Sequence, residues 1–132
     1  HRSTMGWEDW PDGLAAMQVR IHREYAPTAL YVAANGAAEP DAVDADGRVR
    51  DPARERYLAG HLAACARALA AGVPLDAYLV WSLMDNFEWG RGYTQRFGLL
   101  HVDYATQQRR AKDSAWAYRD FIAAHAAAHG LG

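Results

Sequence analysis

Acidic and aromatic residues follow directly on an apolar run in the second half of the chain. The run at 78–83 is rich in β-prone residues, and Asp85, Asn86, Glu88 and Trp89 come immediately after it. A carboxylate can accept hydrogen bonds from paired sugar hydroxyls, while an indole face covers the apolar C–H side of the ring. The segment therefore indicates a carbohydrate-binding rim, and the alternative is a strand that ends in a polar turn.

Three helices are predicted from helical spacing and from the residues at their ends. An apolar stripe at 14–25 follows a Pro-Asp-Gly turn and is stopped by Pro27. The second helix begins at Asp51, as an N-cap acceptor followed by proline, and stops at Gly72. The third covers 114–129 and ends before Gly130. Residues 39–50, rich in Asp, Gly and Pro, are predicted to form an exposed loop.

Two strands and a further extended piece alternate with these helices. The first strand begins at residue 30 and ends at Asn35-Gly36; the second covers 77–83, apolar on both faces as in a buried parallel strand. Residues 97–102 form the extended piece. This alternation predicts an α/β fold with parallel strands and right-handed crossovers, in which reactive residues lie where the strands end.

The overall composition excludes several classes of protein. With 132 residues, 51% of them hydrophobic, the chain is long enough for one modest domain. A net charge of −2 gives no reason to expect nucleic acid. The densest basic cluster, Arg109, Arg110 and Lys112, is predicted to be a solvated turn.

The location of the protein follows from features that the sequence lacks. Cys65 is its one cysteine, so no intrachain disulfide is possible and a reduced, cytoplasmic setting is expected. No apolar run approaches the roughly 20 residues of a membrane helix, and no signal-peptide core precedes the first helix, so no membrane association is expected. The sequence opens on His1 rather than methionine, which fits a fragment or a processed product.

No metal or other cofactor is predicted. His61 and Cys65 lie four residues apart on one predicted helix face. Two ligands do not make a zinc site, and the apolar neighbours favour core packing. The sequence has no glycine-rich phosphate loop and no serine or cysteine in a nucleophile setting.

Several motifs together resemble the C-terminal part of family 1 β-glycosidases. They are TMGWEDWPDGL at 4–14, YVAANGA at 31–37, WSLMDNFEW at 81–89, RFGLLHVDY at 96–104 and KDSAWAY at 112–118. The resemblance covers nearly the whole chain. It implies a partial (β/α)8 TIM barrel containing about the last two βα units. The single fragment 1–132 then divides into the helix preceding the nucleophile strand (1–26), a strand, loop and helix (27–76), and the last strand, sugar-binding loop and C-terminal helix (77–132).

The same resemblance implies that both catalytic carboxylates are missing. The family pattern Thr-Glu-Asn-Gly is here Ala33-Ala34-Asn35-Gly36, so Ala34 stands at the nucleophile position. The acid/base glutamate of the family lies in an Asn-Glu-Pro motif that this sequence does not contain. Glu39-Pro40 follows an alanine in a predicted loop and is interpreted as turn material. Retaining hydrolysis requires two carboxyl groups, so this chain alone is expected to be inactive.

The sugar-holding residues of the family are better preserved. The resemblance implies that Glu88 accepts hydrogen bonds from the outer hydroxyls, that Trp89 donates its indole N–H, that Trp81 stacks beneath the ring and that Phe97 helps to close the pocket. Asn35 follows the nucleophile position in the family pattern. The residues alone leave alternatives open: a solvated carboxylate for Glu88, a core side chain for Trp81 and a simple turn for Asn35.

These observations support three functional hypotheses. The first is the C-terminal part of a β-glucosidase-like enzyme that acts on β-linked glucosides or related sugars and needs a complementary barrel chain. The second is a non-catalytic barrel fragment that associates with copies of itself, because two parallel strands leave open edges. The third is a weak carbohydrate-binding module. Mass determination in native conditions separates the first two.

Overall fold

The computed structural model describes residues 1–130, and its three helices and first two strands follow the predicted order. The elements are α1 (Pro11–Tyr25), β1 (Leu30–Asn35), α2 (Pro52–Ala70), β2 (Leu75–Val80), the 3-10 turn η1 (Trp89–Arg91), β3 (Leu100–Val102), β4 (Arg109–Ala111) and α3 (Asp113–His129). The prediction of a solvated turn at Arg109 and Arg110 was wrong, because these residues form a strand that pairs with 100–102. Among the described residues, no helix is long and apolar enough to cross a membrane.

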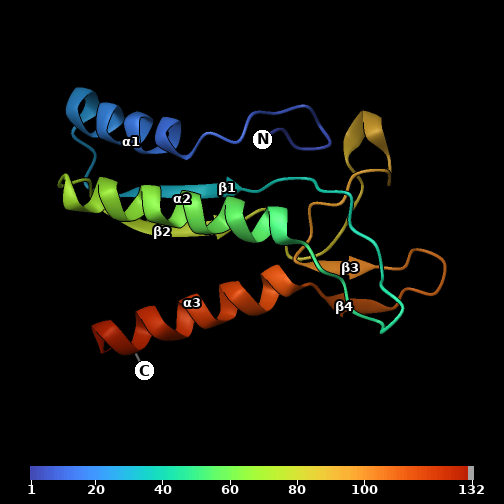
Figure 1. Cartoon of the computed structure of the whole chain (residues 1–132). Helices are drawn as coiled ribbons and strands as arrows, with labels where there is room; N and C mark the ends of the chain where they lie inside the picture. Colours follow the sequence, from blue (N-terminus) through green and yellow to red (C-terminus); the bar gives the residue numbers. More distant parts are fainter. Residues whose placement is uncertain (131–132) are drawn as a thin grey trace.

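The strands β1 and β2 are parallel, and α2 connects them (Figure 1). Leu30 is aligned with Leu75 and Asn35 with Val80, so both strands end at the same edge of the sheet. The antiparallel pair β3–β4 and the turn η1 lie beyond that edge (Figure 1). The chain is therefore an α/β unit in which the loops after the strands meet at one end.

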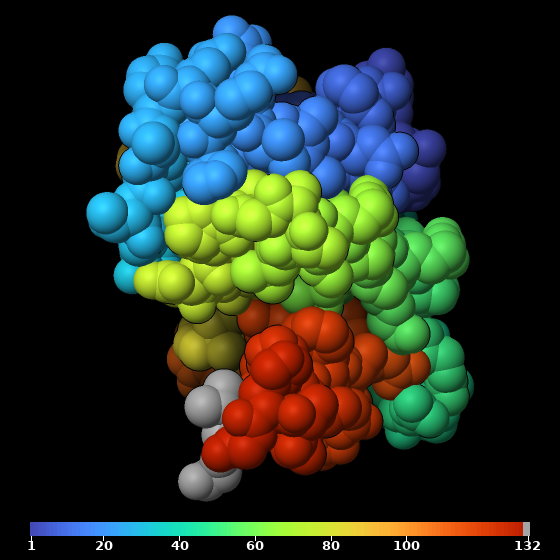
Figure 2. All heavy atoms as spheres, turned by 90° about the vertical axis from the view of Figure 1, so that its left-hand side faces the viewer, coloured from blue at the N-terminus to red at the C-terminus, as the bar shows by residue number. Residues whose placement is uncertain are grey.

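The three helices lie in a row in chain order, with α2 between α1 and α3 (Figure 2). Alanine dominates α2 and allows close packing, since Ala64 and Ala68 are fully buried there. The helices cover one face of the β1–β2 sheet only. Side chains alternate between the faces of a strand, and on the other face Tyr31 of β1 and Leu79 of β2 are exposed.

The prediction that 77–83 is a strand buried on both faces was wrong in two respects. The strand ends at Val80, and the side chains on its second face are exposed, with Leu79 at 50% and Trp81 at 46%. Tyr31 on β1 is exposed at 58%. The apolar pattern was read correctly, but these described residues include nothing that covers this second face.

The composition of residues 39–50 predicted an exposed loop between β1 and α2. Part of this loop is buried instead. Residues 42–48 are largely solvent-accessible, but Ala38 and Val49 are fully buried and Asp41 lies inside the protein. Lys112, predicted to belong to a solvated turn, is also fully buried. Both corrections have one cause, because the Lys112 ammonium is paired with the Asp41 carboxylate at 2.5 Å. Long-range pairing of this kind allows charges to be buried.

Asp51 takes the N-cap position of α2 as predicted, but its side chain does not cap that helix. Its carboxylate instead accepts hydrogen bonds from the backbone N–H of Ser114 at 2.8 Å and from the Ser114 hydroxyl at 2.5 Å. Ser114 lies in the first turn of α3, where backbone N–H groups have no partner within the helix. Asp51 thus joins the beginnings of two helices.

Candidate functional site

A hollow of about 350 Å³ opens beside the carboxyl ends of β1 and β2. It is lined by Trp7, Ala34, Gly36, Trp81, Glu88 and Phe97. Four of these, Ala34, Trp81, Glu88 and Phe97, are positions that the sequence had singled out. The volume is in the usual range for small-ligand sites, and its lining combines aromatic rings with one carboxylate, a combination suited to a sugar ring.

The backbone beside Trp81 is tied to both neighbouring segments. The N–H of Trp81 donates to the carbonyl of Asn35 at 2.9 Å, which extends the β1–β2 pairing past the last strand residue. Ser82 donates its N–H to the carbonyl of Phe97 at 3.3 Å, and Leu99 donates back to Ser82 at 2.9 Å. Trp81 and Phe97 therefore reach the hollow from paired backbone segments.

Glu88 reaches the hollow from the loop after β2. Its backbone N–H donates to the carbonyl of Gly92 at 2.7 Å, which closes the turn around η1. Within residues 1–130, no side chain or backbone group donates a hydrogen bond to the Glu88 carboxylate. A partly exposed carboxylate without an internal partner is available to accept hydrogen bonds from a ligand.

Two predicted residues, Asn35 and Trp89, do not line the hollow. The side-chain oxygen of Asn35 accepts a hydrogen bond from the Tyr78 hydroxyl at 2.6 Å and is used inside the protein. Trp89 lies at the start of η1 and is 83% exposed. The structure therefore brings together Glu88, Trp81 and the Ala34 position, but it leaves Trp89 at the rim.

Trp7 is a wall of the hollow that the sequence reasoning did not select. Its ring lies 5.9 Å from that of Phe97, in a tilted arrangement. The segment before it is fixed by Thr4, whose backbone N–H donates to Ala38 at 3.0 Å and whose hydroxyl donates to Gln95 at 2.6 Å. The signal that could have identified Trp7 was its place in GWEDW, a motif that had served only to establish the family resemblance.

Glu39 is buried, which corrects its interpretation as turn material. It is 4% exposed, and its carboxylate lies 3.0 Å from Nε2 of His1. Burial raises the pKa of Glu39 above its ordinary value, and the positive charge of Arg54 offsets this only in part. Glu39 lines a smaller adjoining pocket of about 70 Å³, which shares Trp7 and Gly36 with the hollow.

Asp85, which the sequence placed on the carbohydrate-binding rim with Glu88, is buried instead and does not line the hollow. It is 3% exposed, and its carboxylate accepts hydrogen bonds from Nζ of Lys112 at 2.9 Å and from Arg96 at 2.8 Å. The backbone N–H groups of Gly98 and Val102 add two more, at 3.0 and 3.2 Å. Burial by itself raises the pKa of Asp85, but Lys112 and the hydrogen bonds outweigh burial and hold this pKa below 3.8.

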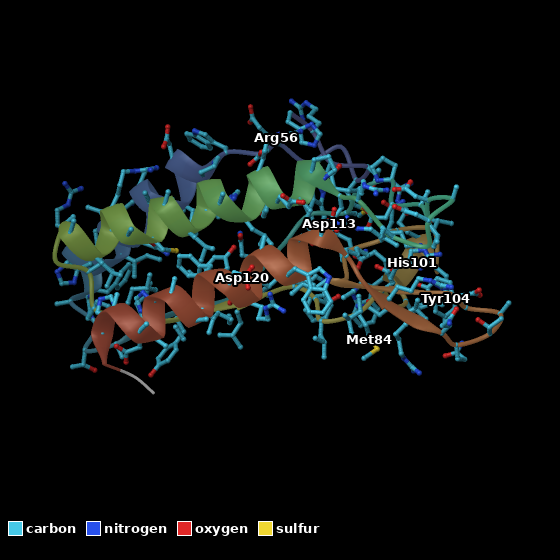
Figure 3. The ribbon with its side chains drawn as sticks, turned by 60° about the horizontal axis from the view of Figure 1, so that its bottom comes forward. Arg56, Met84, His101, Tyr104, Asp113 and Asp120 are labelled. Carbon is cyan, nitrogen blue, oxygen red and sulfur yellow. The ribbon has the colours of Figure 1, made fainter. Side chains whose placement is uncertain are left out.

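The ion pairs of Asp85 continue into a larger buried network. Lys112 also binds Asp41, and Arg54 joins Asp41 at 2.7 Å to Asp51. Three carboxylates face three basic side chains, since Arg96 completes the set. The network lies near the N-terminus of α3, and Figure 3 shows His101 and Tyr104 beyond that end of the helix. The network joins the loop after β1 and the loop after β2 to the helices α2 and α3.

The two candidate metal ligands of α2 are engaged in the interior. The His61 ring stacks on Tyr57 with centroids 3.9 Å apart, and its Nδ1–H donates to the Tyr57 carbonyl at 2.8 Å. Cys65 is buried and accepts a hydrogen bond from Gln18. In the described part of the chain, no group of three or more His, Cys, Asp or Glu side chains could hold a metal ion.

Comparison with known proteins identifies the family. Residues 1–127 match the family described as Glycosyl hydrolase family 1, and the chain belongs to it. Beta-glucosidase A of Thermotoga maritima is 46% identical over 121 residues, which are 92% of this chain and 27% of that protein. The bifunctional beta-D-glucosidase/beta-D-fucosidase of Bifidobacterium breve is 48% identical over 127 residues, which are 93% of this chain and 28% of that protein.

The fold agrees with that of solved family members. The family 1 β-glucosidase of Thermotoga maritima in complex with isofagomine lactam superposes with a TM-score of 0.92 at 45% identity, covering 92% of this chain and 28% of that one. The β-glucosidase of the same organism in complex with deoxynojirimycin gives a TM-score of 0.91 with the same coverage and identity. The chain thus spans little more than a quarter of the length of these relatives.

Proposed function

We propose that this chain is the sugar-holding, C-terminal part of a β-glucosidase-like retaining glycoside hydrolase that acts on β-glycosidic bonds. The observation that carries the proposal is the hollow, in which Trp81, Glu88 and Phe97 surround the Ala34 position. Glu88 accepts hydrogen bonds from sugar hydroxyls, Trp81 offers an exposed ring face, and Phe97 forms the buried wall. Trp89 at the rim donates its indole N–H to an outer hydroxyl, and Asn35 shapes the strand end.

Hydrolysis is not expected from the chain alone. Retaining catalysis needs two carboxyl groups about 5 Å apart, one of which attacks the anomeric carbon. Ala34 presents a methyl group at the position that the family resemblance assigns to the nucleophile. The buried acid Glu39 lines the adjoining pocket rather than the hollow. Without a nucleophile, cleavage falls by several orders of magnitude even in a complete barrel.

We propose that residues 1–132 are one fragment of a (β/α)8 barrel, comprising about its last two βα units and divided at 26/27 and 76/77. Two parallel strands, and a match that covers only 27% of Beta-glucosidase A, support this assignment. A complementary barrel chain is the partner that covers the exposed sheet face, and a second copy of this chain is the alternative. A cytoplasmic location remains our proposal.

The experiment that tests sugar holding is a titration of this chain with deoxynojirimycin and with glucose, followed by tryptophan fluorescence. We expect saturable binding in about the millimolar range, because the opposing wall of the site is missing. Glu88→Ala should abolish the change, whereas Glu24→Ala, on the outer surface of α1, should leave it intact. An unchanged signal at high ligand concentration, or the same titration in Glu88→Ala, would overturn the proposal.

The assignment of Ala34 has its own test. Ala34→Glu is prepared in a barrel completed with the remaining units of a relative, and cleavage of an aryl glucoside is compared with that of the same barrel carrying Ala34. We expect a gain of at least about a thousandfold, since a positioned nucleophile is restored. No gain, in a barrel shown to be assembled by its native mass, would mean that the nucleophile position lies elsewhere.

A further inference from the structure

The Asp85 carboxylate binds both sequence neighbours of Phe97, one through its backbone and the other through its side chain. One oxygen accepts a hydrogen bond from the N–H of Gly98 at 3.0 Å, and the other accepts one from the guanidinium of Arg96 at 2.8 Å. Phe97 lies between these two residues in the sequence and is 3% exposed. Asp85 therefore restrains the segment that presents the Phe97 ring to the hollow.

The same residue also fixes the loop that carries Glu88. The N–H of Asp85 donates to the carbonyl of Leu100 at 3.0 Å, and Glu88 follows three residues later. A β-carbon built on Gly98 would lie 2.1 Å from the Asp85 nitrogen, so the two segments are in direct backbone contact. Asp85 thus lies in the loop that carries Glu88 and contacts the segment that carries Phe97.

Lys112, the residue before α3, fixes the position of the Asp85 carboxylate. Its ammonium is fully buried and donates to Asp85 at 2.9 Å and to Asp41 at 2.5 Å. Burying an ion pair costs desolvation energy that an apolar core would not incur, so a buried pair is weak evidence for a purely stabilising role. Such pairs can instead select one geometry among similar packings.

We propose that Asp85, held in place by Lys112, is a positioning residue for sugar recognition that fixes Glu88 and Phe97 at the spacing one sugar ring requires. Asp85 does not line the hollow and acts only through the residues it holds. The inference rests on the proposed sugar-holding function. Under this inference, the affinity for sugar depends on Asp85 and Lys112, which do not line the hollow, as well as on the lining residues.

The test compares Asp85→Asn with Asp51→Asn in this chain. Both remove one buried carboxylate charge from the same network, but Asp51 itself contacts Arg54 and Ser114 and reaches residues 96–102 only through Arg54, which donates to the Arg96 carbonyl at 2.6 Å. In deoxynojirimycin titrations, we expect Asp85→Asn to weaken binding at least about tenfold and Asp51→Asn to change it less than about twofold, although both lower the melting temperature. Equal losses in the two variants, or unchanged affinity in Asp85→Asn, would overturn the inference.

Amide NMR shifts of the ligand-free chain separate this inference from the proposed function. We expect Asp85→Asn to shift the resonances of Glu88 and Phe97, and Asp51→Asn to leave them in place, whether or not sugar binds. Absence of sugar binding in the unaltered chain would remove the proposed function, while unmoved resonances in Asp85→Asn would remove the positioning role. If Asp85→Asn does not fold, Asp85→Glu keeps the charge and moves it by one methylene. Unfolding of both beside a folded Asp51→Asn would assign Asp85 to the fold alone and reject the proposal.

Discussion

Gly36 and Trp81 lie in direct backbone contact at the floor of the hollow. A β-carbon built on Gly36 would lie 1.7 Å from the carbonyl oxygen of Trp81, closer than any real contact. The Trp81 N–H already donates to the Asn35 carbonyl, so the two strand ends are held at this separation. Glycine is needed here because of the close approach, rather than for an unusual backbone angle.

Replacing Gly36 by alanine should therefore destabilise the protein by about 1–3 kcal/mol, because backbone atoms cannot yield as a flexible side chain can. Urea unfolding followed by circular dichroism measures the change. Gly90→Ala is the matched control, since nothing lies within 4 Å of a β-carbon at Gly90. Equal stability of the two variants would contradict the close packing of the strand ends.

Removing the Lys112 charge should be among the most damaging substitutions. In Lys112→Met, the carboxylates of Asp41 and Asp85 lose a shared cation inside the protein. Breaking a buried pair from one side costs about 3–5 kcal/mol, because the remaining charge is left uncompensated. Arg109→Ala, at an exposed position of β4, should cost less than about 0.5 kcal/mol. Similar unfolding midpoints for both variants would show that Lys112 is solvated.

Stability should fall as the solution is acidified from neutral pH, with His101 as one cause. Burial, followed by the positive charge of Arg96, lowers the pKa of His101 below 6.5. Between that lowered pKa and 6.5, the unfolded chain binds a proton that the folded chain does not, so stability is lost as pH decreases through this range. Urea midpoints at several pH values, compared with those of His101→Gln, should show a smaller dependence in the variant. A dependence that is identical in the variant would exclude His101 as a cause.

The exposed face of the β1–β2 sheet should make the isolated chain associate. Tyr31 and Leu79 present apolar surface there, and large patches of this kind on soluble proteins mark interaction sites. Leu79→Lys should reduce the apparent mass in light scattering and reduce binding of a hydrophobic dye. Ala66→Lys, at an exposed position of α2 on the opposite side of the sheet, serves as the control. A monodisperse monomer before any substitution would show that this face needs no cover.

The order of the elements could be predicted because its signals are local. Pro27 and Gly72 mark helix ends through their own backbone preferences, and the apolar runs are periodic within a few residues. The meeting of Ala34 and Glu88 also follows from the pattern, since parallel strands separated by a helix end on the same edge. The sugar-facing roles that we propose for particular residues came from family resemblance instead.

The burial of charged residues could not be predicted in this way. Lys112 and Asp41 are 71 residues apart, so neither neighbourhood shows that the other supplies a partner. The N-cap pattern at Asp51 is the same whether the side chain caps its own helix or another one. Trp7 became a wall of the hollow through its contact with Phe97, which also joins distant parts of the sequence.

The carboxylate of Asp51 couples local unfolding at the beginnings of α2 and α3. Because Asp51 is the N-cap residue of α2 and accepts two hydrogen bonds from the first turn of α3, loosening of either helix at that end frees the other as well. The first turns of both helices should then exchange amide hydrogens with solvent at matching rates, as one cooperative unit. The distal turns of α3, which lack such a tether, should exchange sooner.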